Sequence, residues 1–281
     1  MKKFCLFLFI VFTLVVVISA LVVLSEKAPI GQKVAVVRIE GPIVDSKETI
    51  EEIKGYLKNS SVKAIVLRVD SPGGAVAPSQ EIYEEVKRAS KQKKVVASMG
   101  TVAASGGYYI SSPATKVFAN PGTLTGSIGV IMEIPNIEGL MDKIGVKTEV
   151  IKSGKHKDMA SIFRKMKEED RRILQGVIED VHEQFISAVA EGRRLPIEKV
   201  REIADGRVFT GKQAKEIGLV DELGNLEDAI KEAARLSGIK GEPEVITKKD
   251  RFTFLDAIRG KLSGTLKEAI PTFGLKYMLT P

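Results

Sequence analysis

The sequence contains no tryptophan, one cysteine and two histidines among its 281 residues. The single cysteine, Cys5, excludes an internal disulfide framework and a metal site built from several cysteines. Two histidines leave little room for a centre with several imidazole ligands. Residues 206–213 nearly match a phosphate-binding loop, but Gln213 stands where a Ser or Thr would bind Mg²⁺. We therefore expect no metal and no cofactor.

The net charge of +7 is spread along the chain rather than gathered in one basic block. Basic and acidic residues alternate, as in KMKEEDRR over residues 165–172. A nucleic-acid-binding protein usually concentrates its positive charge on one face. The pattern predicts a solvated basic surface and no nucleic-acid partner, with attraction to anionic lipid headgroups as the next alternative.

The N-terminus carries one long apolar run. Residues 4–24 hold no charged side chain, and as a helix they would span roughly 30 Å, the thickness of a bilayer core. Lys2 and Lys3 precede the run, which places residues 1–3 in the cytoplasm. We predict an uncleaved transmembrane anchor at the cell membrane, a linker over residues 25–33 and an extracytoplasmic remainder. The alternative is a cleaved signal peptide, whose apolar core is usually shorter.

The rest of the chain alternates between buried strands and amphipathic helices. This alternation predicts an α/β domain with largely parallel strand pairing over residues 34–247. Strands are expected at 34–39, 64–69, 95–99, 117–119, 127–132 and 146–151, and helices at 47–59, 78–91, 137–144, 168–193, 196–204, 211–217 and 225–237. Residues 248–281 form a separate tail with an amphipathic helical pattern at Leu255, Ile258, Leu262, Leu266 and Ile270.

Two glycine-rich segments follow buried strands, DSPGG at 70–74 and AASGGYY at 103–109. The carboxyl ends of parallel strands are where α/β sheets bind ligands. Consecutive glycines let backbone N–H groups approach a substrate, as an acyl-transfer enzyme requires for its oxyanion. Ser105 lies between small residues and is open to attack a carbonyl. The alternative is a small-residue patch where a helix crosses a sheet closely.

A nucleophilic serine needs a base. His182 falls among acidic residues of a predicted helix and is expected on the surface, whereas His156 adjoins a candidate loop. A lysine can act instead if burial lowers its pKa from about 10.4 toward neutrality. The loop SGKHKD at 153–158, preceded by Lys152, offers three lysines, and spacing alone leaves open whether Lys152, Lys155 or Lys157 turns inward.

Five segments occur in an order and spacing that resemble the S49 serine protease family, in its short, single-repeat signal peptide peptidase A form. They are DSPGG, AASGGYYIS, ANPGTLTGSIGV, SGKHKD and GRVFTGKQAKEIGLVDELG, and the similarity covers roughly residues 34–236. The resemblance implies a fold like that of Clp protease and crotonase, a spiral of ββα units, here preceded by one transmembrane helix.

The resemblance also implies the roles of individual residues. Ser105 is then the nucleophile, Lys157 the general base, and Ser127 the residue that orients the lysine. Gly106 and, less directly, Gly74 would supply the oxyanion N–H groups. His156 stands before the lysine, where many relatives carry Tyr.

The expected function is that of a membrane-anchored serine endopeptidase with a Ser–Lys dyad. Its expected partners are hydrophobic peptides, such as cleaved signal peptides with small or medium side chains beside the scissile bond, and the lipid bilayer. The resemblance further implies a ring-like homo-oligomer, from tetramer to octamer. The alternatives are a stomatin-linked type of protease that cuts membrane partner proteins, acyl-CoA chemistry of the crotonase type, and a non-catalytic membrane scaffold.

Overall fold

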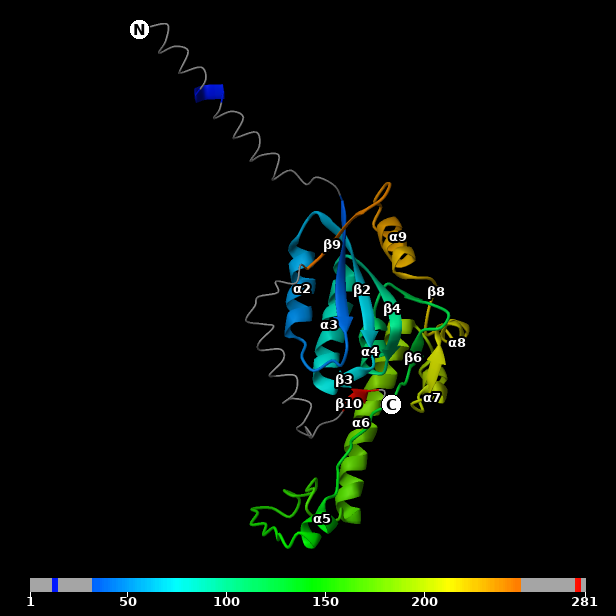
Figure 1. The fold of residues 1–281 in the computed structure, drawn as a ribbon. Coiled ribbons are helices and arrows are strands. Elements are labelled where there is room, and N and C mark those ends of the chain that lie inside the picture. The colour runs from blue at the N-terminus through cyan, green and yellow to red at the C-terminus, as the bar shows by residue number, and fades with distance from the viewer. Residues whose placement is uncertain (1–11, 15–31, 249–275, 279–281) are drawn as a thin grey trace, which may run out of the picture.

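A computed structural model describes residues 12–14, 32–248 and 276–278 (Figure 1). Its centre is a sheet with the strand order β7–β6–β4–β2–β1–β9, and β5 pairs with both β4 and β8. The strands are β1 (Lys33–Glu40), β2 (Val62–Ser71), β4 (Lys94–Ala104), β5 (Lys116–Ala119), β6 (Leu124–Gly126), β7 (Val208–Thr210), β8 (Glu222–Leu223) and β9 (Glu244–Thr247).

The three central strands β1, β2 and β4 pair in parallel, and Val36, Val66 and Val96 lie in register across them. Each is a run of apolar, largely β-branched residues buried on both faces, which is the pattern of parallel strands covered by helices. Because all three strands run the same way, their carboxyl ends meet at one edge of the sheet. β6 and β7 pair antiparallel beside that edge.

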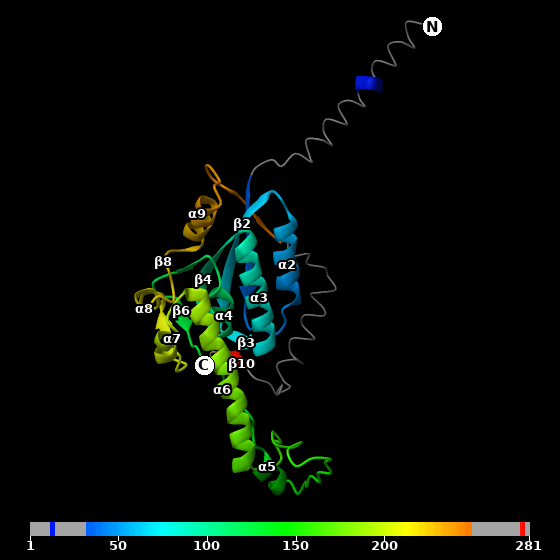
Figure 2. The same cartoon turned by 180° about the vertical axis from the view of Figure 1, so that it is seen from behind.

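Helices cover both faces of the sheet (Figures 1 and 2). One face packs α9 against alternate residues of the strands, among them Val34, Val36 and Phe118. The larger core on the other face contains residues of α3, α4 and α6. The helices are α2 (Lys47–Lys58), α3 (Val76–Gln92), α4 (Gly106–Ser111), α5 (Glu138–Lys143), α6 (Glu168–Arg193), α7 (Ile197–Ile203), α8 (Gly211–Glu216) and α9 (Leu226–Leu236).

The predicted α/β class is confirmed, but two predicted strands are wrong. No strand covers the predicted residues 127–132; the strand in this region, β6, lies just before them and ends at Gly126. It ends there because Ser127 has a φ of 51°, which is outside the extended conformation. Residues 146–151 form no strand. They lie away from the sheet, and Ile151 is fully exposed, so no neighbouring strand pairs with them.

Two terminal predictions fall mainly outside the described residues. Residues 12–14 of the predicted anchor are helical, and the remainder of 4–24 lies outside the described part. No helix within the described ranges has the length and hydropathy to cross a membrane. The helical pattern over 255–270 also lies outside them. Residues 276–278 form a short strand, β10 (Lys276–Met278), which pairs antiparallel with β3 (Gly73–Ala75).

Candidate active site

Ser105 occupies a strained turn between β4 and α4. Its backbone angles are φ 52° and ψ −117°, a conformation that L-residues rarely adopt. Its N–H donates to the carbonyl of Gly126 at 2.8 Å, and its carbonyl accepts from the N–H of Tyr109 at 2.8 Å. Such strain costs on the order of 1–3 kcal/mol and clusters at functional sites. Other hydrolases also hold a nucleophilic serine on a sharp strand-to-helix turn, although the side chain of Ser105 is buried in this structure and not open as the sequence predicts.

The two glycines after Ser105 allow α4 to pack against the ends of β2 and β3. A Cβ on Gly107 would lie 2.7 Å from the carbonyl oxygen of Ser71. A Cβ on Gly106 would lie 2.8 Å from Ser79 Oγ and 3.1 Å from the Cα of Gly73. Both contacts are closer than a real Cβ atom allows. The absence of side chains at Gly106 and Gly107 therefore lets α4 pack closely and leaves the Gly106 N–H uncovered by a side chain of its own.

The chain's own segment β10 lies against the strand edge beside Ser105. Tyr277 is the register partner of Gly74 in the antiparallel pair. Its carbonyl oxygen would be 1.9 Å from a Cβ on Gly73 and 3.1 Å from one on Gly106. An extended peptide therefore runs past the nucleophile with one carbonyl between the two glycine-rich turns.

Of the two predicted oxyanion donors, Gly106 lies against this carbonyl, and Gly74 is the register partner of Tyr277. The N–H of the neighbouring Gly73 donates to Ser71 Oγ at 3.1 Å. A pair of backbone N–H groups around one carbonyl oxygen is the arrangement that stabilises an oxyanion during acyl transfer. The oxyanion roles of Gly74 and Gly106 stay predictions.

The side chain of Tyr277 fills an aromatic pocket. Its ring lies 5.2 Å from that of Tyr109 and 4.7 Å from that of Phe185, centroid to centroid. Its hydroxyl donates to the carbonyl of Val181 at 3.2 Å, so the pocket has a polar end. Burial raises the pKa of the Tyr277 phenol well above its usual value and that of Tyr109 to about 12. Both rings stay neutral at any working pH.

Ser127 lies beside Ser105 along the sheet edge, because Ala104 pairs with Gly126 in the ladder of β4 and β6. It too has a left-handed backbone, with its N–H donating to the Arg207 carbonyl at 2.9 Å. Ser127 lines a cavity of about 320 Å³. The cavity is also lined by Gly129, Val130, Ile131, Ile178, His182, Ala204, Asp205, Gly206 and Met278.

His182 is not the surface residue that its acidic neighbours predict. It is partly buried, and its Nε2 atom is buried without a hydrogen-bond partner among the described residues. His182 lies one turn after Ile178 on α6, so both side chains reach the same cavity. Sequence reasoning could not find this, because the cavity walls that cover His182 come from segments far away in the chain.

Lys157 differs from its two lysine neighbours in having no carboxylate partner within the described residues. Lys152 forms an ion pair with Asp158, whose pKa is held far below its usual value by hydrogen bonds from Arg164 and Lys152. Lys155 pairs with Glu169 at 2.6 Å. Lys157 itself is exposed. A base must lose its proton, so an unpaired lysine suits the role better than either paired one.

The structure does not bring Lys157 to Ser105 within one chain. The Lys157 loop is bound to the start of α6, where His156 lies 3.8 Å from Asp170. Ser105 belongs to the part of the molecule that packs near Phe185. From Asp170 to Phe185, α6 rises by roughly 22 Å. Figures 1 and 2 both show α5 and the following loop at the far end of α6 from the sheet.

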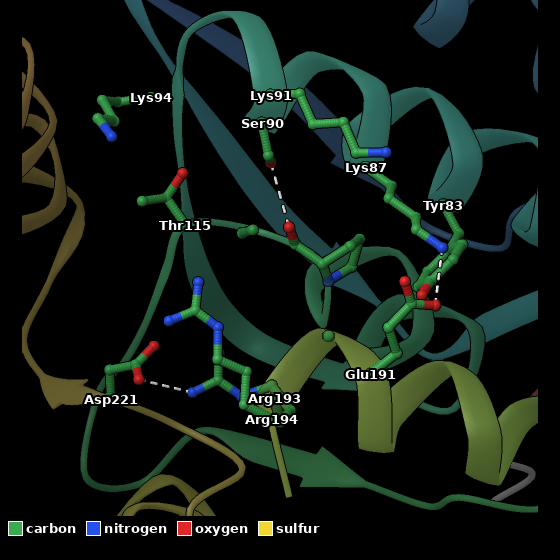
Figure 3. A pocket seen from close by; sticks show the side chains of 13 residues that line it. Tyr83, Lys87, Ser90, Lys91, Lys94, Thr115, Glu191, Arg193, Arg194 and Asp221 are labelled. Carbon is green, nitrogen blue, oxygen red and sulfur yellow. Dashed lines mark hydrogen bonds and ion pairs between the residues drawn. The ribbon is translucent and has the colours of Figure 1, made fainter.

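A second cavity, of about 370 Å³, lies at the opposite edge of the sheet (Figure 3). It is rich in basic side chains from the C-terminal ends of α3 and α6. Arg193 pairs with Asp221 at 2.7 Å, and Lys87 pairs with Glu191 at 2.7 Å. Positive charge at helix C-termini offsets the helix dipole. The two ion pairs join α6 to the sheet and to α3. None of their four residues is a nucleophile beside a base.

Together, a strained serine, two glycine-rich turns and an extended segment that pairs beside them are the features expected of an α/β serine peptidase. No cluster of three His, Cys, Asp or Glu side chains that could hold a metal occurs in the described part of the chain. Comparison with known families agrees with this class. Residues 87–240 match peptidase family S49, and residues 33–125 match Clp protease.

Individual relatives carry protease names. The chain is 47% identical to "Putative protease slr0021" of Synechocystis sp., over 76% of this chain and 77% of the relative. It is 37% identical to Protease 4 of Salmonella typhi, over 88% and 41%. It is 36% identical to "Putative signal peptide peptidase SppA" of Enterococcus faecium, over 73% and 64%. The chain thus spans less than two thirds of the latter two proteins.

The chain belongs to peptidase family S49, and it is a serine peptidase with a Clp protease-like α/β fold. The resemblance inferred from the sequence motifs is thereby confirmed.

Proposed function

We propose that this protein is a membrane-anchored serine endopeptidase that uses Ser105 as its nucleophile and Lys157 as its general base. The observation that carries the proposal is β10, an extended segment whose Tyr277 carbonyl lies against Gly73 and Gly106 beside Ser105. Strand addition of this kind is a general way of binding extended peptides. A substrate bound in the same way would present its scissile carbonyl after the residue in the Tyr277 pocket.

The chemistry follows from the groups around that carbonyl. Neutral Lys157 takes the proton of the Ser105 hydroxyl while Oγ forms a bond to the carbonyl carbon. The N–H groups of Gly74 and Gly106 stabilise the resulting oxyanion. The C–N bond breaks as Lys157 gives the proton to the leaving amine. Water, deprotonated by the same lysine, then hydrolyses the ester on Ser105.

Lys157 would come from a second copy of the chain. The support is the separation along α6 and the apolar character of the region that carries the lysine. Leu140 and Ile144 are 58% and 62% exposed, and Ile151 is fully exposed. Exposed apolar surface of this kind marks interaction sites. We propose that this arm, residues 137–167, packs on a neighbouring copy and completes its site. A closed ring of such head-to-tail contacts is the expected assembly.

The proposed substrates are hydrophobic peptides at the extracytoplasmic face of the membrane, and remnant signal peptides fit best. The relative named as a signal peptide peptidase supports this class. The pocket that holds Tyr277 is lined by Tyr109 and Phe185, so it takes a larger residue than the small or medium one that the family resemblance implies. A protease that cuts folded membrane partners is the alternative.

The test is an assay of full-length protein in detergent or nanodiscs on two substrates, a synthetic signal peptide and a folded single-span membrane protein. The proposal expects cleavage of the peptide, loss of activity in Ser105→Ala and in Lys157→Ala, and full activity in Lys155→Ala. Cleavage of the folded protein alone would favour the alternative. Undiminished activity of Lys157→Ala would refute the dyad.

A further inference from the structure

His182 lines the cavity beside Ser127, where we propose that the base, Lys157, acts. Met278, the residue after the Tyr277 carbonyl, lines it as well. In the bound peptide this is the side of the leaving amine. The general acid that protonates the amine must enter this space, because the other side of the carbonyl is occupied by the glycine turns.

The Nε2 atom of His182 is buried and has no hydrogen-bond partner among the described residues. A buried polar atom left unsatisfied costs about 1–3 kcal/mol, so a partner that arrives from outside is the physically expected completion. Only two described residues share this condition, and the other one, His156, lies on the arm beside Lys157.

The remaining walls of the cavity suit a neutral amine. Val130, Ile131 and Ile178 are apolar. The one carboxylate in the lining, Asp205, is already held by the guanidinium of Arg207 at 2.8 Å. A lysine that enters this space therefore meets hydroxyl and imidazole groups but no free negative charge. That environment disfavours the ammonium form and leaves the amine able to act as a base.

We infer that His182 is a positioning residue for the base. Its Nε2 accepts a hydrogen bond from the Lys157 amine of a second copy, while the Ser127 hydroxyl makes another contact to that amine. With two contacts fixed, the lone pair of the amine faces Ser105 Oγ. His182 does not touch the reacting carbonyl and takes no proton. This inference rests on the proposed dyad and names a further residue of the same site.

The experiment uses full-length protein with three substitutions on α6. His182→Leu removes the nitrogen at similar volume, His182→Gln keeps an acceptor in the side chain, and Gln175→Leu is a control at an exposed position of the same helix. Initial rates on a hydrophobic peptide give kcat and KM separately. Thermal midpoints and sizing report folding and assembly.

We expect His182→Leu to lower kcat about tenfold with an unchanged KM, as the loss of one hydrogen bond to the amine implies. In dissociated subunits its thermal midpoint should be equal or higher, because there the substitution removes a buried atom that has no partner. His182→Gln should recover most of kcat, and Gln175→Leu should match the unmodified protein.

Two results would overturn the positioning role. One is His182→Leu with unchanged kcat, and the other is a change confined to KM, which would make His182 part of the peptide-binding wall. A separate comparison of variants tests the dyad itself. If Lys157→Ala stays active while His182→Leu is inactive, His182 is the base within one chain, and both the dyad and the positioning role fall.

Discussion

Ser105 and Lys157 should complement each other between copies of the chain. Ser105→Ala and Lys157→Ala are each expected to lose activity by a factor on the order of 10⁴ or more, since dyad members act as a unit. In an equal mixture with free subunit exchange, half of the sites have an intact serine, and half of those receive an intact lysine from the neighbour. About a quarter of the unmodified activity should return.

The dependence on mixing ratio makes this prediction sharp. The recovered activity should follow the product of the two subunit fractions, with its maximum at equal amounts and none at either extreme. The assay is the release of a fluorescent peptide product, and energy transfer between labelled subunits verifies exchange. Exchange without any recovered activity would refute delivery of Lys157 by a second copy. The reason to expect delivery is α6, which rises by roughly 22 Å between Asp170 beside the Lys157 loop and Phe185 near the Ser105 turn.

Three further predictions concern the peptide groove, the lysine and the core. A chain ending at Leu275 should show an apparent KM about tenfold lower for added peptide, with unchanged kcat, because β10 no longer competes with the peptide. The factor assumes a local β10 concentration on the order of 1 mM and a dissociation constant on the order of 0.1 mM. Ser127→Ala should lower kcat roughly 10–100-fold, because the proposed hydrogen bond to the Lys157 amine is lost, and it should leave thermal stability unchanged. Asp221→Ala should reduce the free energy of unfolding in urea by about 3 kcal/mol, since it leaves the buried Arg193 guanidinium without its carboxylate; activity per folded molecule should persist.

Three results would contradict these expectations. An unchanged KM for the shortened chain would mean that β10 does not occupy the groove in solution. A Ser127→Ala enzyme at full rate would remove that residue from the site. A urea midpoint unaffected by Asp221→Ala would show that Arg193 finds another partner.

The sequence was sufficient to predict the parallel strands at the centre of the sheet. The runs at residues 34–39, 64–69 and 95–99 are apolar on both faces, which local composition reveals directly. Ser105 stands in a glycine-rich turn after such a run, and the structure shows a strained backbone there; its role as nucleophile stays a prediction. Lys157 could be selected from its neighbours only by resemblance, because the ion pairs that engage Lys152 and Lys155 depend on how the loop folds onto α6.

Other features could not have been predicted, because they depend on long-range contacts. β10 has three residues and pairs with a strand some 200 residues earlier, so no local periodicity marks it. His182 is surrounded in sequence by acidic residues, yet residues 129–131 and 204–206 cover it in the fold. The strand expected at 127–132 failed for a related reason. Its composition is that of a strand, but the left-handed Ser127 is required by the turn onto the Arg207 carbonyl.

The length of α6 has a consequence for when this enzyme can work. With Lys157 as base, a single chain keeps its nucleophile and its base apart by more than half the length of the 26-residue helix α6. A freshly synthesised or dissociated copy is then inert, however well folded it is. Hydrolysis begins only when the local density of copies passes the threshold for assembly, and it stops on dilution. On the proposed mechanism the helix is a spacer that couples peptide cleavage to the abundance of the enzyme.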